Sequence, residues 1–371
     1  MDRRETERLL AAIAAARHAG EPVALATVVR VRGSAYRREG ARMLVRRDRS
    51  FECAISGGCL EPAVADAAAR VIESGEPVIV NYDLEDDSVW SLAIGCAGAV
   101  DIRIERLDAD AVTQAWLDAL ERGTAAVLVT PLAGTASGRM VVNASGDVIG
   151  SLSDQRLQME CAARAAARMA SAYPRSGSEG VLANEMFFDV TTPPPELIVF
   201  GAGHDAPPIA QTAWALGFAV SVIDVREAFL TRNRFHEATL VSAHFSEFGA
   251  KVTIPGGSFV LVMNHHLDRD RESLRFALDS HASFIGVLGP RQRYERLLTD
   301  LAHQGYAPSA ASLARVRSPV GFSLGAESPA EVAVSIVGEI LAVRRGFEGG
   351  FLSGTAGSLH LPAANRIFAR S

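Results

Sequence analysis

The chain has 371 residues, of which 48% are hydrophobic and 22% are charged, and its formal net charge is −6. This length predicts two domains of an ordinary globular protein, with three as the alternative. No basic field covers the chain and no apolar run is long enough to span a bilayer, so we expect neither nucleic acid nor membrane as a partner. The N-terminal segment lacks the apolar core of a secretion signal, and the 4 cysteines form no CxxC pair. The cytoplasm is therefore the expected compartment, and a structural zinc site is not expected.

The first loop that could bind a ligand lies between two predicted strands. Apolar spacing predicts a helix over residues 5–16, and β-branched runs predict strands over residues 23–31 and 41–45. The loop between these strands is Gly33-Ser34-Ala35-Tyr36-Arg37-Arg38-Glu39-Gly40. Its glycines and arginines suit an anion, although a solvated basic turn explains them equally well. The candidate ligands in this loop are Gly33, Ser34 and Arg37.

A cysteine lies directly before the next predicted helix. The segment is Ile55-Ser56-Gly57-Gly58-Cys59-Leu60-Glu61-Pro62, and the helix is expected to run to about residue 72 because proline favours a first helical turn. Backbone N–H groups at a helix N-terminus favour a thiolate, so Cys59 is a candidate functional cysteine. Gly57 and Gly58 would let a ligand approach the backbone. The alternative is a cysteine that packs as a small buried hydrophobic residue.

A second cysteine is framed by glycines in Gly95-Cys96-Ala97-Gly98, before a predicted strand over residues 100–104. Two such loops in one domain are more than chance placement suggests. Cys96 is therefore the second candidate. By contrast, we expect Cys161 to pack within an alanine-rich helix over residues 158–172.

The segment Thr191-Thr192-Pro193-Pro194-Pro195 predicts a stiff extended linker. The expected organisation is a mixed α/β N-terminal domain over residues 1–190, the linker over 191–195, a second domain over 196–345 and a glycine-rich tail over 346–371. In the second domain, strand and helix patterns alternate regularly. That alternation is typical of a doubly wound parallel sheet.

The second domain opens with Glu196-Leu197-Ile198-Val199-Phe200-Gly201-Ala202-Gly203-His204-Asp205-Ala206, an apolar run that enters a glycine turn and then a helical pattern. A further apolar run ends on Asp224, about twenty residues past the glycines, as in a dinucleotide-binding βαβ unit. Gly201 and Gly203 would shape the turn beside a phosphate, and Asp224 would accept a hydrogen bond from a ribose hydroxyl. A purely structural turn is the alternative.

Two later predicted strands also end at polar residues. One leads into Asn264-His265-His266 and the other into Gly289-Pro290-Arg291. Ligands bind at the carboxyl ends of parallel strands. The residues expected along this edge, beside the glycine turn, are His204, Asn264, His265, Gly289 and Arg291. Adjacent histidines point to different sides, so we favour a polar lining over joint metal ligation.

Together these motifs resemble the XdhC/CoxI family, the accessory proteins of xanthine dehydrogenase and carbon monoxide dehydrogenase. The resemblance covers nearly the whole chain, although Tyr36 stands where a proline is common and Ala97 where a glycine or another small residue often lies. It rests on Gly33-Ser34 with Arg37, Gly40-Ala41-Arg42-Met43, Ser56-Gly57-Gly58-Cys59-Leu60-Glu61, Gly95-Cys96-Ala97-Gly98, Gly201-Ala202-Gly203-His204, Gly286-Val287-Leu288-Gly289-Pro290 and Gly325-Ala326-Glu327-Ser328-Pro329.

The resemblance implies an N-terminal mixed α/β domain followed by a Rossmann-like domain. It also implies a chaperone that binds the molybdenum cofactor, of the molybdopterin type, and supports its sulfuration and insertion into a molybdenum hydroxylase client. A cysteine desulfurase would be the sulfur donor, and a homodimer the assembly. Thiolates are soft ligands, so Cys59 and Cys96 become the expected catalytic residues and molybdenum ligands. Glycine loops and arginines would hold the cofactor's phosphate.

The alternative is an NAD(P)-dependent oxidoreductase that acts on a small molecule. It would use the glycine turn and Asp224, but it leaves both glycine-framed cysteines unused and lacks an evident catalytic constellation beside the nicotinamide. An accessory protein is therefore favoured over a stand-alone enzyme. The Rossmann-like domain would bind NAD(P) or another nucleotide, or its phosphate subsite would hold the tail of the pterin, and the residues do not choose between these.

Overall fold

The computed structural model describes residues 3–33, 35–83, 98–171 and 173–354. These residues form two compact units, which we call the first unit (up to Pro193) and the second unit (Pro194–Gly354). Thr191 is the last residue of a strand, so the expected linker is shorter by one residue, and the segment without regular structure is 192–195. No strand of one unit pairs with a strand of the other within the described ranges.

The first unit contains two antiparallel five-stranded sheets, with the orders β3-β2-β1-β5-β4 and β8-β7-β6-β10-β9. The strands of the first sheet are β1 (Val23–Gly33), β2 (Arg42–Arg46), β3 (Phe51–Glu52), β4 (Val78–Asp83) and β5 (Gly98–Arg106). Those of the second sheet are β6 (Ala126–Ala133), β7 (Gly138–Asn143), β8 (Val148–Leu152), β9 (Gly177–Val181) and β10 (Asn184–Thr191). The helices are α1 (Arg3–His18), α2 (Glu61–Ser74), α3 (Ala111–Arg122) and α4 (Gln155–Ala170).

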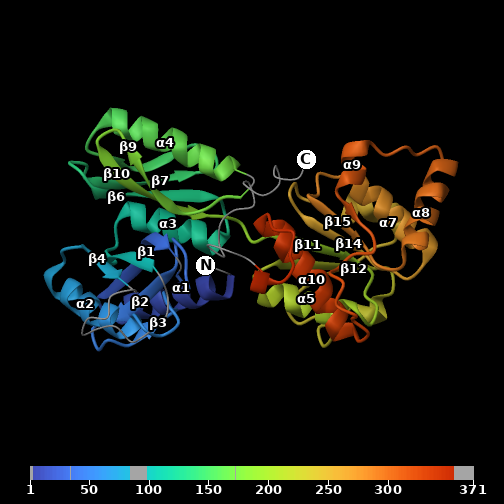
Figure 1. The fold of residues 1–371 in the computed structure, drawn as a ribbon, viewed down its shortest axis with the longest axis horizontal. Coiled ribbons are helices and arrows are strands. Elements are labelled where there is room, and N and C mark those ends of the chain that lie inside the picture. The colour runs from blue at the N-terminus through green and yellow to red at the C-terminus, as the bar shows by residue number, and fades with distance from the viewer. Residues whose placement is uncertain (1–2, 34, 84–97, 172, 355–371) are drawn as a thin grey trace. The chain divides into compact units, whose positions relative to one another are not determined.

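Helices and sheets alternate in layers through the first unit (Figure 1). Helix α2 packs on the outer face of the first sheet, α1 and α3 fill the space between the sheets, and α4 covers the outer face of the second sheet. Strand β1 is buried on both faces: Ala24 and Ala26 pack toward α2, whereas Val23 and Leu25 pack toward α1 and α3. This explains why its sequence is continuously apolar rather than alternating.

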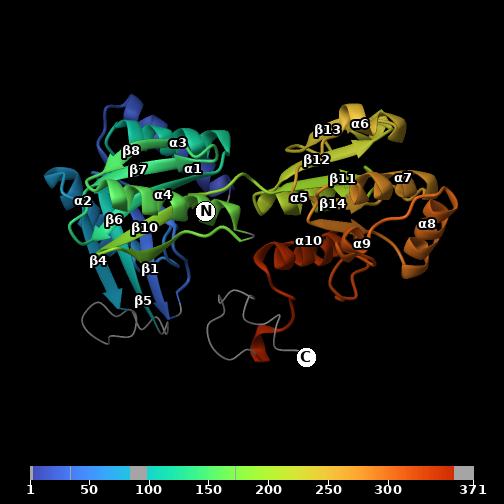
Figure 2. The same ribbon diagram turned by 90° about the horizontal axis from the view of Figure 1, so that it is seen from above.

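The second unit is a parallel six-stranded sheet with the order β13-β12-β11-β14-β15-β16. Helices α5 and α10 pack on one face and α7 and α8 on the other, as Figures 1 and 2 show. The predicted doubly wound parallel sheet is confirmed. The strands are β11 (Glu196–Phe200), β12 (Ala219–Asp224), β13 (Thr239–Ser242), β14 (Phe259–Val262), β15 (Phe284–Val287) and β16 (Val316–Arg317). The helices are α5 (Ala206–Ala215), α6 (Phe248–Lys251), α7 (Leu267–Leu278), α8 (Arg291–His303), α9 (Ala310–Ala314) and α10 (Pro329–Arg345).

Local capping signals account for several helix starts. Ser328 and Glu331 form a reciprocal capping box at the start of α10. Helix α4 begins at Gln155, before the expected residue 158, because the Asp154 side chain accepts a hydrogen bond from the Leu157 N–H at 2.8 Å.

None of the helices in the described ranges has the length and apolar character needed to cross a membrane.

Candidate functional site

Strand register pairs the last residues of two strands that border predicted motifs. Strands β1 and β5 are antiparallel, and their pairing ends with Gly33 opposite Gly98. Gly33 and Gly98 therefore lie side by side at one end of the first sheet. Two predicted site residues, Ser34 and Cys96, lie outside the described residues.

A cleft lies between the loop after β1 and the Ser56–Cys59 loop. Its volume is about 460 Å³, within the size range of small-molecule sites. Its walls come from the loop after β1, the start of β3 and the segment before α2. The lining residues are Tyr36, Arg37, Phe51, Ala54, Ser56, Gly57, Gly58, Glu61 and Pro62. Three predicted site residues, Arg37, Gly57 and Gly58, are thus brought together.

The backbone conformation requires glycine at only one of the two glycine positions in the cleft. Gly58 has a φ of +110°, which side chains rarely adopt. Gly57 has no such constraint, and a Cβ at either position would meet no atom within 4 Å. The fold itself therefore gives no reason for glycine at position 57, and the open space beside it leaves the backbone accessible to a ligand.

A buried carboxylate fixes the shape of this loop. Glu61 accepts hydrogen bonds from the Ile55 and Ser56 N–H groups, at 3.1 and 2.8 Å, and from the Ser56 hydroxyl. The Ser56 hydroxyl oxygen in turn accepts from the Gly58 and Leu60 N–H groups. Burial disfavours the charged Glu61, but the hydrogen bonds from Ser56 outweigh it and hold the pKa of Glu61 below its usual range. The shape of the loop is therefore held by hydrogen bonds within the chain.

Cys59 lies beside the cleft rather than in its lining. It precedes Leu60, the N-cap of α2, so it is one residue outside the helix. Its half-buried Sγ donates to the Ser56 Oγ at 3.4 Å and packs partly against the α2 face of the first sheet. Two other cysteines are buried: desolvation raises the pKa of Cys161 to about 11 and also raises that of Cys53. Cys161 packs inside the unit, as expected, and Cys59 is the most accessible thiol of the described residues.

Arg37 reaches the cleft as one half of an ion pair. Its guanidinium donates to both carboxylate oxygens of Glu5 on α1, at 2.6 and 2.8 Å. This bidentate pair holds the guanidinium in place and offsets its charge. An anion at Arg37 would therefore share it with Glu5.

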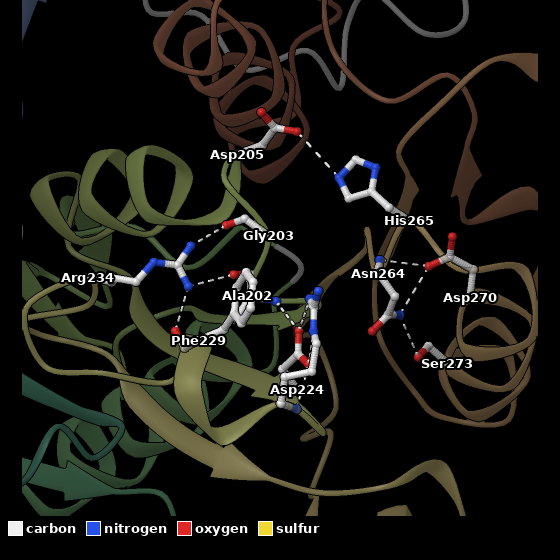
Figure 3. A network of polar contacts seen from close by, with 11 residues as sticks. Ala202, Gly203, Asp205, Asp224, Phe229, Arg234, Asn264, His265, Asp270 and Ser273 are labelled. Atoms are coloured by element: carbon white, nitrogen blue, oxygen red, sulfur yellow. Dashed lines mark hydrogen bonds and ion pairs between the residues drawn. The ribbon is translucent and has the colours of Figure 1, made fainter.

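In the second unit, the glycine turn after β11 lies at the carboxyl edge of the sheet (Figure 3). Gly201 has a φ of +116°, and a Cβ there would lie 2.5 Å from the Met263 carbonyl oxygen. A Cβ at Gly203 would instead lie 3.4 Å from Cδ2 of the His265 ring. Gly201 is thus required by the close approach of β11 to the end of β14, whereas the space over Gly203 is bordered by the His265 imidazole.

The Asp224 carboxylate is already hydrogen-bonded to neighbouring residues. Its side chain is 1% exposed, and it accepts hydrogen bonds from the Ala202 N–H at 2.8 Å and from both the backbone and the guanidinium of Arg226. Burial disfavours the carboxylate, but the hydrogen bonds from Arg226 and Ala202 outweigh it, so the pKa of Asp224 lies below its usual range. A ribose hydroxyl would have to displace Arg226 to reach this acceptor.

A second arginine closes the turn from the other side. The Arg234 guanidinium donates to the carbonyl oxygens of Ala202, Gly203 and Phe229, at 2.8, 2.8 and 2.6 Å (Figure 3). The Phe229 ring lies against both arginines, with its centroid 4.1 Å from the Arg226 Cζ and 5.0 Å from the Arg234 Cζ. Sequence reasoning missed Arg234 and Phe229, because they lie outside every motif and reach the turn only through the fold.

The other predicted edge residues have mixed surroundings. Asn264 donates from its backbone and side chain to the buried Asp270, which also pairs with Arg293. His265 has a φ of +57°, uncommon for a residue with a side chain, and its Nε2 lies 3.5 Å from Oδ2 of Asp205. Three more residues were predicted at this edge of the sheet. The His204 ring lies edge-on to Phe229, and Gly289 has a φ of +112°. Arg291 is 68% exposed and pairs with Glu295.

Comparison with known proteins finds relatives over most of the chain. Residues 16–83 match the family model described as the XdhC and CoxI family, and residues 197–340 match that of the XdhC Rossmann domain. A protein of Bacillus subtilis (strain 168) described as a probable xanthine dehydrogenase subunit is 31% identical over 330 residues, which cover 88% of this chain and 94% of that protein. The molybdenum cofactor insertion chaperone PaoD of Escherichia coli (strain K12) is 24% identical over 327 residues, covering 88% and 84%. A crystal structure described as a xanthine dehydrogenase from Bacillus halodurans has a TM-score of 0.76 at 29% identity, covering 96% of this chain and 98% of that chain.

Proposed function

The chain belongs to the XdhC and CoxI family, and on that premise we propose that it is a maturation chaperone that binds the molybdenum cofactor and delivers it to a molybdenum hydroxylase. Its similarity to a protein named as a molybdenum cofactor insertion chaperone supports this. The observation that carries the proposal is the cleft of the first unit, where two motifs meet around glycines whose Cβ positions face open space.

The residues near this cleft fit such a cofactor. The open backbone at Gly57 and Gly58 admits a bulky group, and the Arg37–Glu5 pair offers N–H donors for an anion. Cys59 is the proposed thiolate ligand of molybdenum, since soft metals favour sulfur ligands, and Cys96 is the proposed second one. The bound cofactor supplies the molybdenum centre that the client uses. Further parts of the proposal are sulfuration by a cysteine desulfurase, a homodimeric assembly and a location in the cytoplasm.

The contacts in the second unit argue against the alternative, an NAD(P)-dependent oxidoreductase. The acceptor expected to bind ribose, Asp224, is engaged by Arg226 and the Ala202 N–H. In the first turn of α5, Pro207 and Pro208 remove two N–H donors from the place where a pyrophosphate would bind. Asp205 adds a carboxylate there, which would repel a phosphate. These features do not fit a dinucleotide, so we derive no hydride transfer at this edge.

The deciding experiment compares retention of molybdenum cofactor with retention of nicotinamide nucleotides. The purified full-length protein is incubated with molybdenum cofactor, and separately with NAD and NADP, and then gel-filtered. We expect molybdenum and pterin to co-elute with the protein and neither NAD nor NADP to do so. Absence of molybdenum cofactor retention, or retention of NAD(P) alone, would contradict the proposed function.

The thiolate role is tested with Cys59→Ser, Cys96→Ser and the double variant. Cys161→Ala is the matched control, because Cys161 is buried in α4 away from the cleft. Loss of retention in Cys59→Ser, with an unchanged circular dichroism spectrum and an unaffected control, supports a ligand role. Full retention in both single variants and in the double variant removes that role.

A further inference from the structure

Two large aromatic side chains are exposed around the cleft of the first unit. Tyr36 is 72% exposed and Phe51 is 43% exposed, and both line the cleft. Aromatic side chains of this size dominate protein cores because burial of their rings is favourable. No other aromatic ring packs against either one within the described part of the chain. Packing against another ring therefore does not account for their position.

The backbone holds both rings at the mouth of the cleft. Phe51 begins β3, the edge strand of the first sheet, and pairs in register with Val45 of β2. Tyr36 follows β1 and precedes Arg37, which is tied to α1 through Glu5. Each ring is thus attached to a fixed segment. Rigid aromatic groups lose little conformational entropy when they bind a ligand.

The floor of the cleft is open backbone. A Cβ at Gly57 or Gly58 would meet no atom within 4 Å, so a flat group can lie against this segment. The charged side chains of the cleft already have partners: Glu5 pairs with Arg37, and the Glu61 carboxylate accepts hydrogen bonds from the Ile55 and Ser56 N–H groups and the Ser56 hydroxyl. A cleft with aromatic walls, an open floor and partnered charges suits an uncharged planar heterocycle.

We propose that Tyr36 and Phe51 form an aromatic subsite that stacks on the planar pterin ring system of the bound cofactor, above the Gly57–Gly58 backbone. This inference rests on the proposed function, because it assigns one part of the cofactor to one part of the cleft. Stacking of a heterocycle on an aromatic side chain is favourable, so removal of one ring should weaken binding by about tenfold, which corresponds to about 1.4 kcal/mol.

The test uses a metal-free probe, 6-hydroxymethylpterin, whose fluorescence reports its binding to the full-length apoprotein. Tyr36→Ala and Phe51→Ala should each weaken pterin binding by about tenfold. Tyr36→Phe keeps the ring and should bind as the wild type does. Tyr173→Ala is the matched control, because Tyr173 is a 41% exposed tyrosine of the same unit that does not line the cleft.

The outcomes separate the subsite from the proposed function. Wild-type affinity for the pterin in both alanine variants, or no pterin binding to the wild type, overturns the subsite, even where the wild type retains the molybdenum cofactor. Ring-dependent pterin binding without retention of the whole cofactor supports the subsite and contradicts the delivery function. If Phe51→Ala disturbs β3, as a lower melting temperature would reveal, Tyr36→Ala in its exposed loop decides the matter alone.

Discussion

Asp224 and Cys59, one from each candidate site, differ in how many of their lone pairs are already used in hydrogen bonds. The Asp224 carboxylate is buried and accepts hydrogen bonds from Arg226 and the Ala202 N–H, so it stabilises the glycine turn. The half-buried Cys59 thiol makes a single hydrogen bond, to Ser56, among the described residues. Its sulfur therefore keeps lone pairs for a soft metal. This contrast favours the first unit over the second as the site of the proposed cofactor binding.

Glu61 should make the stability of the first unit depend on pH. Its pKa is lower in the folded chain than in the unfolded chain, so its stabilising contribution is complete above the unfolded pKa of about 4.3 and is lost as pH falls through the folded value. Glu61→Gln should lower the free energy of unfolding by about 2 kcal/mol at pH 7, because hydrogen bonds to the charged group are weakened. The difference from the wild type should narrow below about pH 4.

Calorimetric melting at several pH values measures this difference. Glu73→Gln, which changes an exposed acid on the same helix, is the control and should melt like the wild type throughout. A Glu61→Gln deficit that stays constant from pH 7 to strongly acidic conditions would contradict the assigned charge.

At the scale of elements, the turn between β11 and α5 has the glycine pattern of a dinucleotide site, but its contacts are largely internal. Arg234 binds its carbonyl groups, the Asp224 carboxylate accepts from one of its N–H groups, and the His265 ring borders the space over Gly203. The motif serves here to let β11 and β14 end close together. The elements of the first unit behave differently, because the Gly57–Gly58 segment before α2 faces open space.

The two glycines of the turn after β11 should respond differently to substitution. Gly201→Ala introduces a Cβ 2.5 Å from the Met263 carbonyl oxygen at a φ of +116°, so we expect a loss of about 3 kcal/mol or more. Gly203→Ala makes an ordinary 3.4 Å contact with the His265 ring, and the expected loss is under about 1 kcal/mol. Urea unfolding of both variants measures the difference. Equal losses would show that the close approach of β11 to β14 does not determine the need for glycine.

At the scale of the whole molecule, each unit encloses its own apolar clusters. The clusters around Ile102, Trp116 and Phe188 lie in the first unit, and those around Phe218 and Phe200 lie in the second. Each sheet is also complete within one unit among the described residues. A segment with its own core and complete strand pairing has what it needs to fold alone.

Fragments of the chain should therefore fold independently. We expect residues 1–193 and residues 194–354, produced as separate polypeptides, each to unfold cooperatively with the native helix and strand content. Circular dichroism melts and dispersed amide NMR spectra provide the measurement. A fragment with native secondary structure but no cooperative transition would show that its core depends on the other unit.

Patterns within a few residues of one another were readable in the sequence. Regular alternation indicated the parallel sheet, Ser328 with Glu331 marks the start of α10, and the proline after Cys59 placed this thiol next to α2. These features depend on local spacing, which the chain carries wherever it folds. The same spacing indicated a glycine turn after β11, although it could not say what fills that turn.

Contacts between distant residues were decided only by the tertiary structure. Arg234 reaches Gly203 across 31 positions. Tyr36, in the loop after β1, and Phe51, on β3, come to the same cleft. Gly33 meets Gly98 only through the register of β1 and β5. Such pairs follow from strand order, register and helix packing, which no local pattern specifies. For this reason the sequence alone was enough to predict the cysteines and the glycine loops as candidate sites. Only the fold showed that residues of the chain itself fill most of the glycine turn in the second unit, and that the cleft of the first unit is open.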